Sequence, residues 1–153
     1  MNIEEIRKQA QNENTAPEIL AELANSEDKL TRQYVASNPN TSIKVLERLG
    51  KEFSEVITDN PIFNLLFLEN PHTEFIRISL ARSSTTSAEI LARLADLEYY
   101  HEEHIVRAVA RNPNVPVHVL EMLANDEHIS VKNAVVNNKN TPTEIFDKLS
   151  AYL

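Results

Sequence analysis

An internal repeat restricts the fold of this chain more than any other feature. A short polar tetrad recurs along the sequence as NENT (12–15), NPNT (38–41), a weaker copy NPIF (60–63), SSTT (83–86), NPNV (112–115) and NKNT (138–141). Successive tetrads start 26, 22, 23, 29 and 26 residues apart. A unit of this length cannot bury its own apolar face, but a stack of such units can. The repeat therefore predicts a solenoid.

The residues that follow the tetrads indicate a helix. Apolar pairs stand seven and eight residues after the first tetrad position in five units: Ile19-Leu20, Val45-Leu46, Ile90-Leu91, Val119-Leu120 and Ile145-Phe146. Leucine stands eleven residues after it in the same units: Leu23, Leu49, Leu94, Leu123 and Leu149. These offsets share one helical face. We predict a helix from just after each tetrad to its eleventh or twelfth residue.

The ends of the tetrads carry residues typical of helix starts. Threonine closes four of them: Thr15, Thr41, Thr86 and Thr141. Three of these have a glutamate three residues later, Glu18, Glu89 and Glu144, which is the pattern of a capping box. Pro116 and Pro142 fall at the expected first helical position, where a missing N–H is tolerated. We therefore expect the threonines to be N-caps.

A second apolar-periodic segment precedes the tetrads, for example at 31–37, 75–82, 104–111 and 130–137. Its expected buried positions are mostly four apart: Val35, Ile76, Leu80, Ile105, Val109, Val131 and Val135. Pro39 and Pro113 oppose continuation of this helix through the tetrad. The prediction is an all-α solenoid, one domain over 1–153, of about six repeats that each contain a short helix, a turn and a longer helix.

The unit VRAVARNPNVPVHVLEMLANDEH (106–128) resembles the variant leucine-rich repeat. The resemblance extends over 6–28, 30–51, 73–96, 104–127 and 129–151. It implies a HEAT-like, all-helical, right-handed superhelix that alternates an α-helix with a short helix. Some members carry an iron–sulfur module, which this chain cannot hold through cysteines because it has none. Such a motif indicates fold more than function.

Two segments depart from the repeat. Around 54–72, ten residues separate Asn60 from the next Asn-Pro at Asn70, so we expect a compressed third repeat with a truncated second helix. The fourth unit carries an insertion at 97–104. Insertions in solenoids lie on one face, which is often the binding face. Tyr99 and Tyr100 in this insertion are therefore candidate contact residues, with packing under the loop as the alternative.

Composition excludes several classes of function. A glycine-rich phosphate loop needs several glycines, and this chain has one. The absence of cysteine excludes metal sites that use thiolate ligands. The net charge of −8 opposes broad nucleic-acid binding. His101 and His104 lack the spacing of the zinc-protease motif, so no metal or cofactor is expected. The polar N-terminus and the absence of a long apolar run favour a cytoplasmic protein.

A polar column on the helices before the tetrads is a candidate interaction surface. The column consists of the positions five and one residues before each tetrad. Together with the positions six residues before the tetrads, it forms a locally basic band: Arg32, Gln33, Arg77, Arg82, Arg107, Arg111, Lys132, Asn133 and Asn137. The alternative is that this band is the solvated face of amphipathic helices. Solenoids bind partners along one continuous surface, which favours the first interpretation.

The resulting hypothesis is a non-catalytic protein-binding module or scaffold, since no carboxylate pair stands out as an acid–base catalyst. The net charge of −8 favours a partner with a basic patch. The alternatives are a neutraliser of a basic toxin or nuclease, and a helical-repeat nucleic-acid-binding protein or enzyme. Self-association is a further expectation for the C-terminal cluster of Phe146, Leu149, Tyr152 and Leu153.

Overall fold

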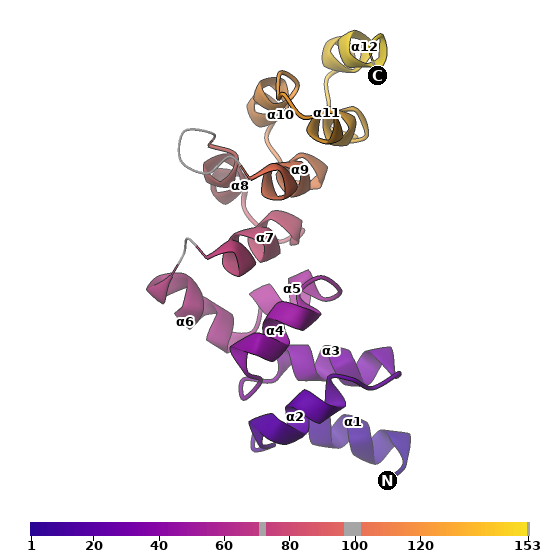
Figure 1. The fold of residues 1–153 in the computed structure, drawn as a ribbon, viewed down its shortest axis with the longest axis vertical. Coiled ribbons are helices and arrows are strands. Elements are labelled where there is room, and N and C mark those ends of the chain that lie inside the picture. The colour runs from indigo at the N-terminus through magenta and orange to yellow at the C-terminus, as the bar shows by residue number, and fades with distance from the viewer. Residues whose placement is uncertain (71–72, 97–101, 153) are drawn as a thin grey trace. The chain divides into compact units, whose positions relative to one another are not determined.

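The computed structural model describes residues 1–70, 73–96 and 102–152, and the regular secondary structure in these ranges is entirely helical (Figure 1). The helices are α1 (Ile3–Gln11), α2 (Pro17–Leu23), α3 (Lys29–Ser37), α4 (Ile43–Leu49), α5 (Ser54–Thr58), α6 (Pro61–Glu69), α7 (Glu74–Arg82), α8 (Ala88–Leu94), α9 (Glu103–Arg111), α10 (Val117–Leu123), α11 (Ile129–Val136) and α12 (Thr143–Ser150). The predicted all-α repeat fold is confirmed.

The chain forms two compact units, Met1–Ser79 and Leu80–Leu153. In the first unit α3 packs between α1 and α5, and in the second unit α9 packs against α11. The helices after the tetrads fill the other layer, since α2 and α4 contact α3 while α8 and α10 contact α9. Equivalent helices of successive repeats are thus neighbours within each unit, as a repeat stack requires.

The prediction placed a short helix before each tetrad and a longer helix after it, and the helix lengths show the reverse order in four repeats. The helices α1, α3, α7 and α9, which precede tetrads, have nine residues each. The helices α2, α4, α8 and α10, which follow tetrads, have seven each. The helix after the tetrad starts one residue later than predicted, because its N-cap is the residue after the tetrad and not the tetrad's last residue.

The third repeat is compressed in its first helix, whereas the prediction placed the compression in its second helix. Its first helix, α5, has only five residues, whereas α6 has nine, so the expected truncation of the second helix is wrong. This tetrad has no threonine at its end, and Asn60 itself caps α6 by accepting a hydrogen bond from Ile62 N at 3.0 Å. The helix therefore starts inside the tetrad and gains a turn.

The predicted core positions are largely buried. Leu20, Leu46, Leu91 and Leu120, eight residues after the tetrad start, are fully buried. Of the positions predicted before the tetrads, Leu80 differs, because it is half-buried and its neighbour Ala81 is buried instead. The apolar side chains that stay exposed include Leu65 and Leu68 on α6 and Phe146 and Tyr152 near the C-terminus.

Three of the four tetrad threonines close the preceding helix and do not cap the next one. Thr15 Oγ1 donates to Gln9 O at 2.6 Å, and Thr41 Oγ1 donates to Val35 O at 2.6 Å. Thr141 Oγ1 makes the same bond to Val135 O. The last carbonyls of a helix have no partner within the helix, so each hydroxyl satisfies one of them.

The N-caps lie one residue after the predicted threonines. They are Ala16, Ser42, Ser87, Pro116 and Pro142. Ser87 accepts a hydrogen bond from Ile90 N at 3.4 Å, while the other four make no side-chain cap bond. The predicted capping boxes are therefore wrong, and the two prolines precede the first helical residue.

The first asparagine of a tetrad joins its repeat to the preceding one. Asn112 Oδ1 accepts from Asn114 N at 2.9 Å, while its Nδ2 donates to Ala81 O at 2.9 Å and Ser83 O at 2.8 Å. The equivalent bonds to two carbonyls of the preceding repeat are made by Asn38, Asn60 and Asn138. Both amide hydrogens are used, so these buried side chains serve the stack.

No helix in the described ranges has both the length and the apolar character needed to cross a membrane.

Candidate functional site

The predicted basic band does not form one free surface. Arg77 is only 5% exposed, so its predicted place on the solvent face is wrong. It stands one residue before the exposed column, and the helical rotation of about 100° per residue turns it toward the packed side. Arg32 is occupied within the chain: its guanidinium donates to Glu52 at 3.1 and 2.6 Å and to the carbonyls of Ser26 and Glu27.

The remaining band residues differ in environment. Gln33 and Lys132 are half-buried, whereas Asn133 and Asn137 are exposed. Asn137 Nδ2 donates to Asn133 O at 2.7 Å, one turn back along α11. Tyr99 and Tyr100 lie outside the described residues.

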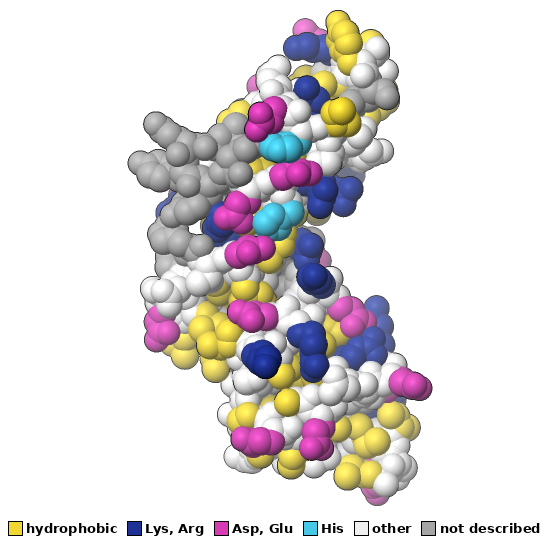
Figure 2. Space-filling model, in the orientation of Figure 1, with side chains coloured by type: hydrophobic (Ala, Val, Ile, Leu, Met, Phe, Trp, Pro, Cys, Tyr) yellow, Lys and Arg dark blue, Asp and Glu magenta, His cyan; other side chains and the backbone are white. Residues whose placement is uncertain are grey.

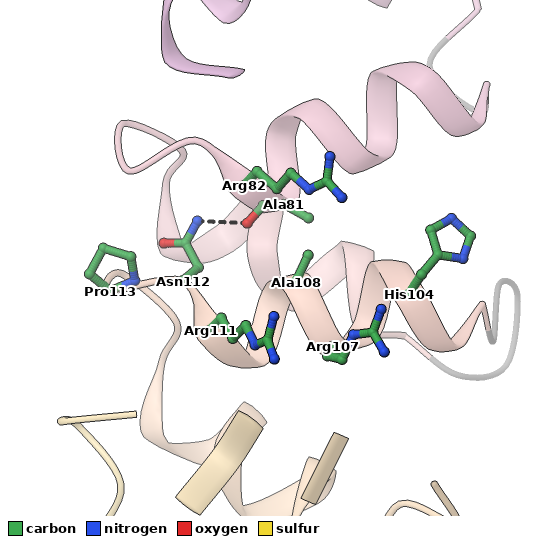
Figure 3. A pocket seen from close by; sticks show the side chains of 8 residues that line it. All are labelled: Ala81, Arg82, His104, Arg107, Ala108, Arg111, Asn112 and Pro113. Carbon is green, nitrogen blue, oxygen red and sulfur yellow. Dashed lines mark hydrogen bonds between the residues drawn. The ribbon is translucent and has the colours of Figure 1, made fainter. Parts of the chain in front are cut away.

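Three arginines of the band lie together around one cleft of the second unit (Figure 3). The cleft has a volume of about 200 Å³ and is lined by Ala81, Arg82, His104, Arg107, Ala108, Arg111, Asn112 and Pro113. Arg82 is the last residue of α7. Four residues of α9 share one face at helical spacing: His104, Arg107, Ala108 and Arg111. We call this site the arginine cleft.

The floor of the arginine cleft is small and fixed. The side chains of Ala81 and Ala108 lie between the longer side chains of the wall (Figure 3). Asn112 is buried, and its amide is held by the carbonyls of Ala81 and Ser83. A ligand in the cleft would therefore contact the arginine side chains of its wall. The floor beneath it is already ordered before the ligand binds.

Two of the three arginines of the cleft have no acidic partner within the described part of the chain. Arg82 and Arg111 are exposed, and within the part of the chain that the structure describes neither makes an ion pair. Arg107 Nη1 lies 3.5 Å from Glu103 Oε1, a long contact. On the face seen in Figure 2, acidic and basic side chains are otherwise interspersed. A guanidinium stays protonated at any physiological pH, so the cleft attracts anions.

Glu103 is held mainly by a different residue. Its Oε1 accepts a hydrogen bond from Ser130 Oγ at 2.5 Å. This bond lowers the pKa of Glu103, and electrostatic interaction with the nearby His128 and Arg107 lowers it further. One carboxylate shared in this way compensates Arg107 weakly and leaves the other two arginines uncompensated.

The equivalent arginine of the first repeat is fully paired. Arg7 and Arg107 both stand five residues before their tetrads. Arg7 binds Asp28 with two bonds, Nε to Oδ2 at 3.0 Å and Nη2 to Oδ1 at 2.9 Å. Asp28 is the N-cap of α3 and also accepts from Thr31. The fork geometry matches a carboxylate with two parallel bonds.

In the sixth repeat the residue at the position of Asp28 is histidine. Asp28 stands ten residues before Asn38, and His128 stands ten residues before Asn138. His128 is half-buried, and its Nδ1 lies 3.0 Å from Oδ1 of the buried Asp126. The N-cap of α11 therefore offers Arg107 no carboxylate of the kind that Arg7 has.

The pair between Arg7 and Asp28 predicts an acid-dependent loss of stability in the first unit. The hydrogen bond from Arg7 holds the pKa of Asp28 well below its usual range, with help from Thr31. A depressed pKa stabilises the fold above the unfolded value of about 3.9, and this contribution is lost as the pH falls through the folded value. We expect Asp28→Asn to lower the melting temperature at pH 7 but to change it much less near pH 2, as measured by circular dichroism. An equal difference at both pH values would contradict this assignment.

A second cleft, of about 270 Å³, lies in the first unit and has mixed charge. It is lined by Lys29, Gln33, Glu52, Phe53, Ser54, Glu55 and Val56. Glu52 already binds Arg32, and this bond lowers the pKa of Glu52. Opposite charges in one wall select no particular class of ligand, so the arginine cleft is the stronger candidate.

The sequence identified the arginines but not the site. His104, Ala81 and Ala108 were not among the predicted contact residues, although the spacing from 104 to 111 places one face of a helix beside Arg82. A comparison of equivalent repeat positions could have shown that the repeat after Arg107 carries His128 where the repeat after Arg7 carries Asp28. No protein-family model, no curated protein and no solved structure matches the chain.

Proposed function

We propose that the chain is a non-catalytic protein-binding module that recognises its partner through the arginine cleft. The observation that carries this proposal is the placement of Arg82, Arg107 and Arg111 around one cleft, with two of them unpaired in the described part of the chain. Arginine is enriched among the residues that dominate binding energy at protein interfaces.

The repeat stack supports binding because it orders the surface in advance. Buried asparagine bonds fix each repeat to the next, and the floor residue Asn112 is one of them. Binding to an ordered surface costs less conformational entropy than binding that must first order a loop. The recurring tetrad also supports our proposal that these repeats are of the variant leucine-rich type, since the first asparagine of four tetrads bonds to two carbonyls of the preceding repeat.

Charge reversal in the cleft tests this function. We expect Arg107→Glu combined with Arg111→Glu to remove a specific partner from a crosslinking pull-down of native lysate, quantified by mass spectrometry. The matched control is Arg93→Glu, an exposed arginine on α8 outside the cleft, which should keep the partner. Circular dichroism would verify that both proteins are folded. Recovery of the same partners by all three proteins would contradict the proposal.

A further inference from the structure

We propose that the arginine cleft binds a short carboxylate-rich segment of the partner protein, with Arg107 holding an Asp or Glu of that segment in the way that Arg7 holds Asp28. This inference rests on the proposed function and adds the chemistry of the partner. It assigns the cleft an acidic ligand, whereas the net charge of the whole chain favours a basic one.

The register of the repeats provides the first argument. The same helix position carries arginine in the first and fifth repeats, and in the first it is covered by a carboxylate of the next repeat. In the sixth repeat the residue at the position of Asp28 is His128, and its Nδ1 lies 3.0 Å from Oδ1 of Asp126. Arg107 thus lacks the doubly bonded carboxylate that Arg7 has, and its ion pair within the described residues is the long contact of 3.5 Å to Glu103.

The neighbouring arginines provide the second argument. Arg82 and Arg111 both stand one residue before a tetrad, where the first, second and sixth units have Gln11, Ser37 and Asn137. These two arginines line the same cleft as Arg107. Three guanidinium groups around one cleft would attract carboxylates, and each guanidinium can bind a carboxylate through charge-assisted hydrogen bonds.

The extent of the cleft indicates a short segment of protein and opposes nucleic acid. The lining face of α9 runs from His104 to Arg111, about 10 Å at 1.5 Å per residue. An extended peptide covers this length with about three residues. The next repeat has neutral Asn137 at the position of Arg111, so the arginines do not continue along the second unit. A phosphate backbone needs many cationic contacts along its length for tight binding, and three arginines at one cleft supply few.

A fluorescein-labelled peptide with a central Asp-Glu-Asp run between Gly and Ser residues is the probe. We expect saturable binding by fluorescence anisotropy with a Kd on the order of 100 µM, as a few charge-assisted contacts would give. The Kd should rise with salt, because the contacts lie at a surface. The same peptide with Asn-Gln-Asn at its centre should not bind. Absence of saturable binding up to millimolar protein, or equal binding of the neutral peptide, would overturn the inference.

Single substitutions should locate the binding. Arg107→Gln and Arg111→Gln should each weaken the peptide about tenfold, the value of one charge-assisted bond. Arg93→Gln, which alters an arginine outside the cleft, should leave the Kd unchanged. Equal Kd values for all three variants and the unmodified chain would overturn the assignment to the cleft.

A sharper variant keeps every arginine. Asp126→Ser combined with His128→Asp turns Asp126-Glu127-His128 into the Ser-Glu-Asp run of residues 26–28 and gives Arg107 an internal carboxylate. We expect this double variant to weaken the peptide about tenfold, and Asp126→Ser alone to bind like the unmodified chain. Unchanged binding by a folded double variant would overturn the analogy with Arg7; if it does not fold, the Arg107→Gln result decides.

Two further probes separate the competing ligands. A peptide with phosphoserine at the centre, or a short single-stranded DNA, should bind no more than about tenfold more tightly than the carboxylate peptide in 150 mM salt. Stronger preference for either would overturn the carboxylate assignment. If the peptide fails while charge reversal still removes the partner in the pull-down, this inference fails and the proposed function stands.

Discussion

Replacing Asn112 by alanine should lower the free energy of unfolding by about 3 kcal/mol, measured by urea denaturation at pH 7. The side chain is 2% exposed and donates to Ala81 O and Ser83 O, while its oxygen accepts from Asn114 N. Alanine removes all three bonds and leaves two carbonyls in a buried setting without these donors. An unpaired buried polar group costs about 1–3 kcal/mol, which is more than the net gain from forming one bond.

The matched control for this prediction is Asn133→Ala on α11. Asn133 is exposed, and the bond that it accepts from Asn137 goes to its backbone oxygen, which alanine keeps. Its free energy of unfolding should change by less than about 0.5 kcal/mol. A loss below about 1 kcal/mol at Asn112 would show that hydrogen bonds between repeats contribute little and that apolar packing alone holds the stack.

The fold was predictable because its signals are local and repeated. A column such as Leu20, Leu46, Leu91 and Leu120 requires only helical periodicity and a constant register, and all four side chains are buried. The position at which each helix ends was also predicted, since α2, α4, α8 and α10 end at the leucine eleven residues after the tetrad start. A single apolar residue predicts helix weakly, but the same spacing repeated in several units predicts it strongly.

The roles within the tetrad were not predictable from the same pattern. A threonine between two helices can accept a bond from the N–H groups of the second helix or donate one to the carbonyls of the first, and both are unsatisfied within a helix. The structure shows donation, as from Thr41 to Val35 O. The choice depends on the path of the turn, which the buried Asn38 fixes through bonds to the preceding repeat. Those bonds join residues more than twenty positions apart, and no local pattern reports them.

The candidate site was predictable in part for the same reason. The column of polar positions brought Arg82, Arg107 and Arg111 together, and the structure places all three at one cleft. The column could not show that Arg77 is buried or that Arg32 binds Glu52, because both facts depend on packing between repeats. The weaker pairing of Arg107 became visible only by comparison with the pair between Arg7 and Asp28.

Replacing Leu120 by alanine should cost about 4 kcal/mol of the free energy of unfolding, within the range of 2–5 kcal/mol for buried leucines. Leu120 lies on α10 with no exposed surface, and α10 packs against both α9 and α11. The substitution removes apolar contacts and leaves a cavity between the two layers of the second unit, which a repeat stack cannot fill without moving several helices. Urea denaturation followed by circular dichroism measures the change.

Met122 on the same helix is the matched control, since it is 39% exposed and is also a long apolar side chain. Met122→Ala should cost less than about 1 kcal/mol, because little apolar area leaves a buried environment. Both substitutions place alanine in the same helix, so helix propensity changes little between them and the difference reports burial. Similar losses for the two variants would mean that the leucine column does not form the core of the second unit, and the repeat packing described for α9, α10 and α11 would be wrong.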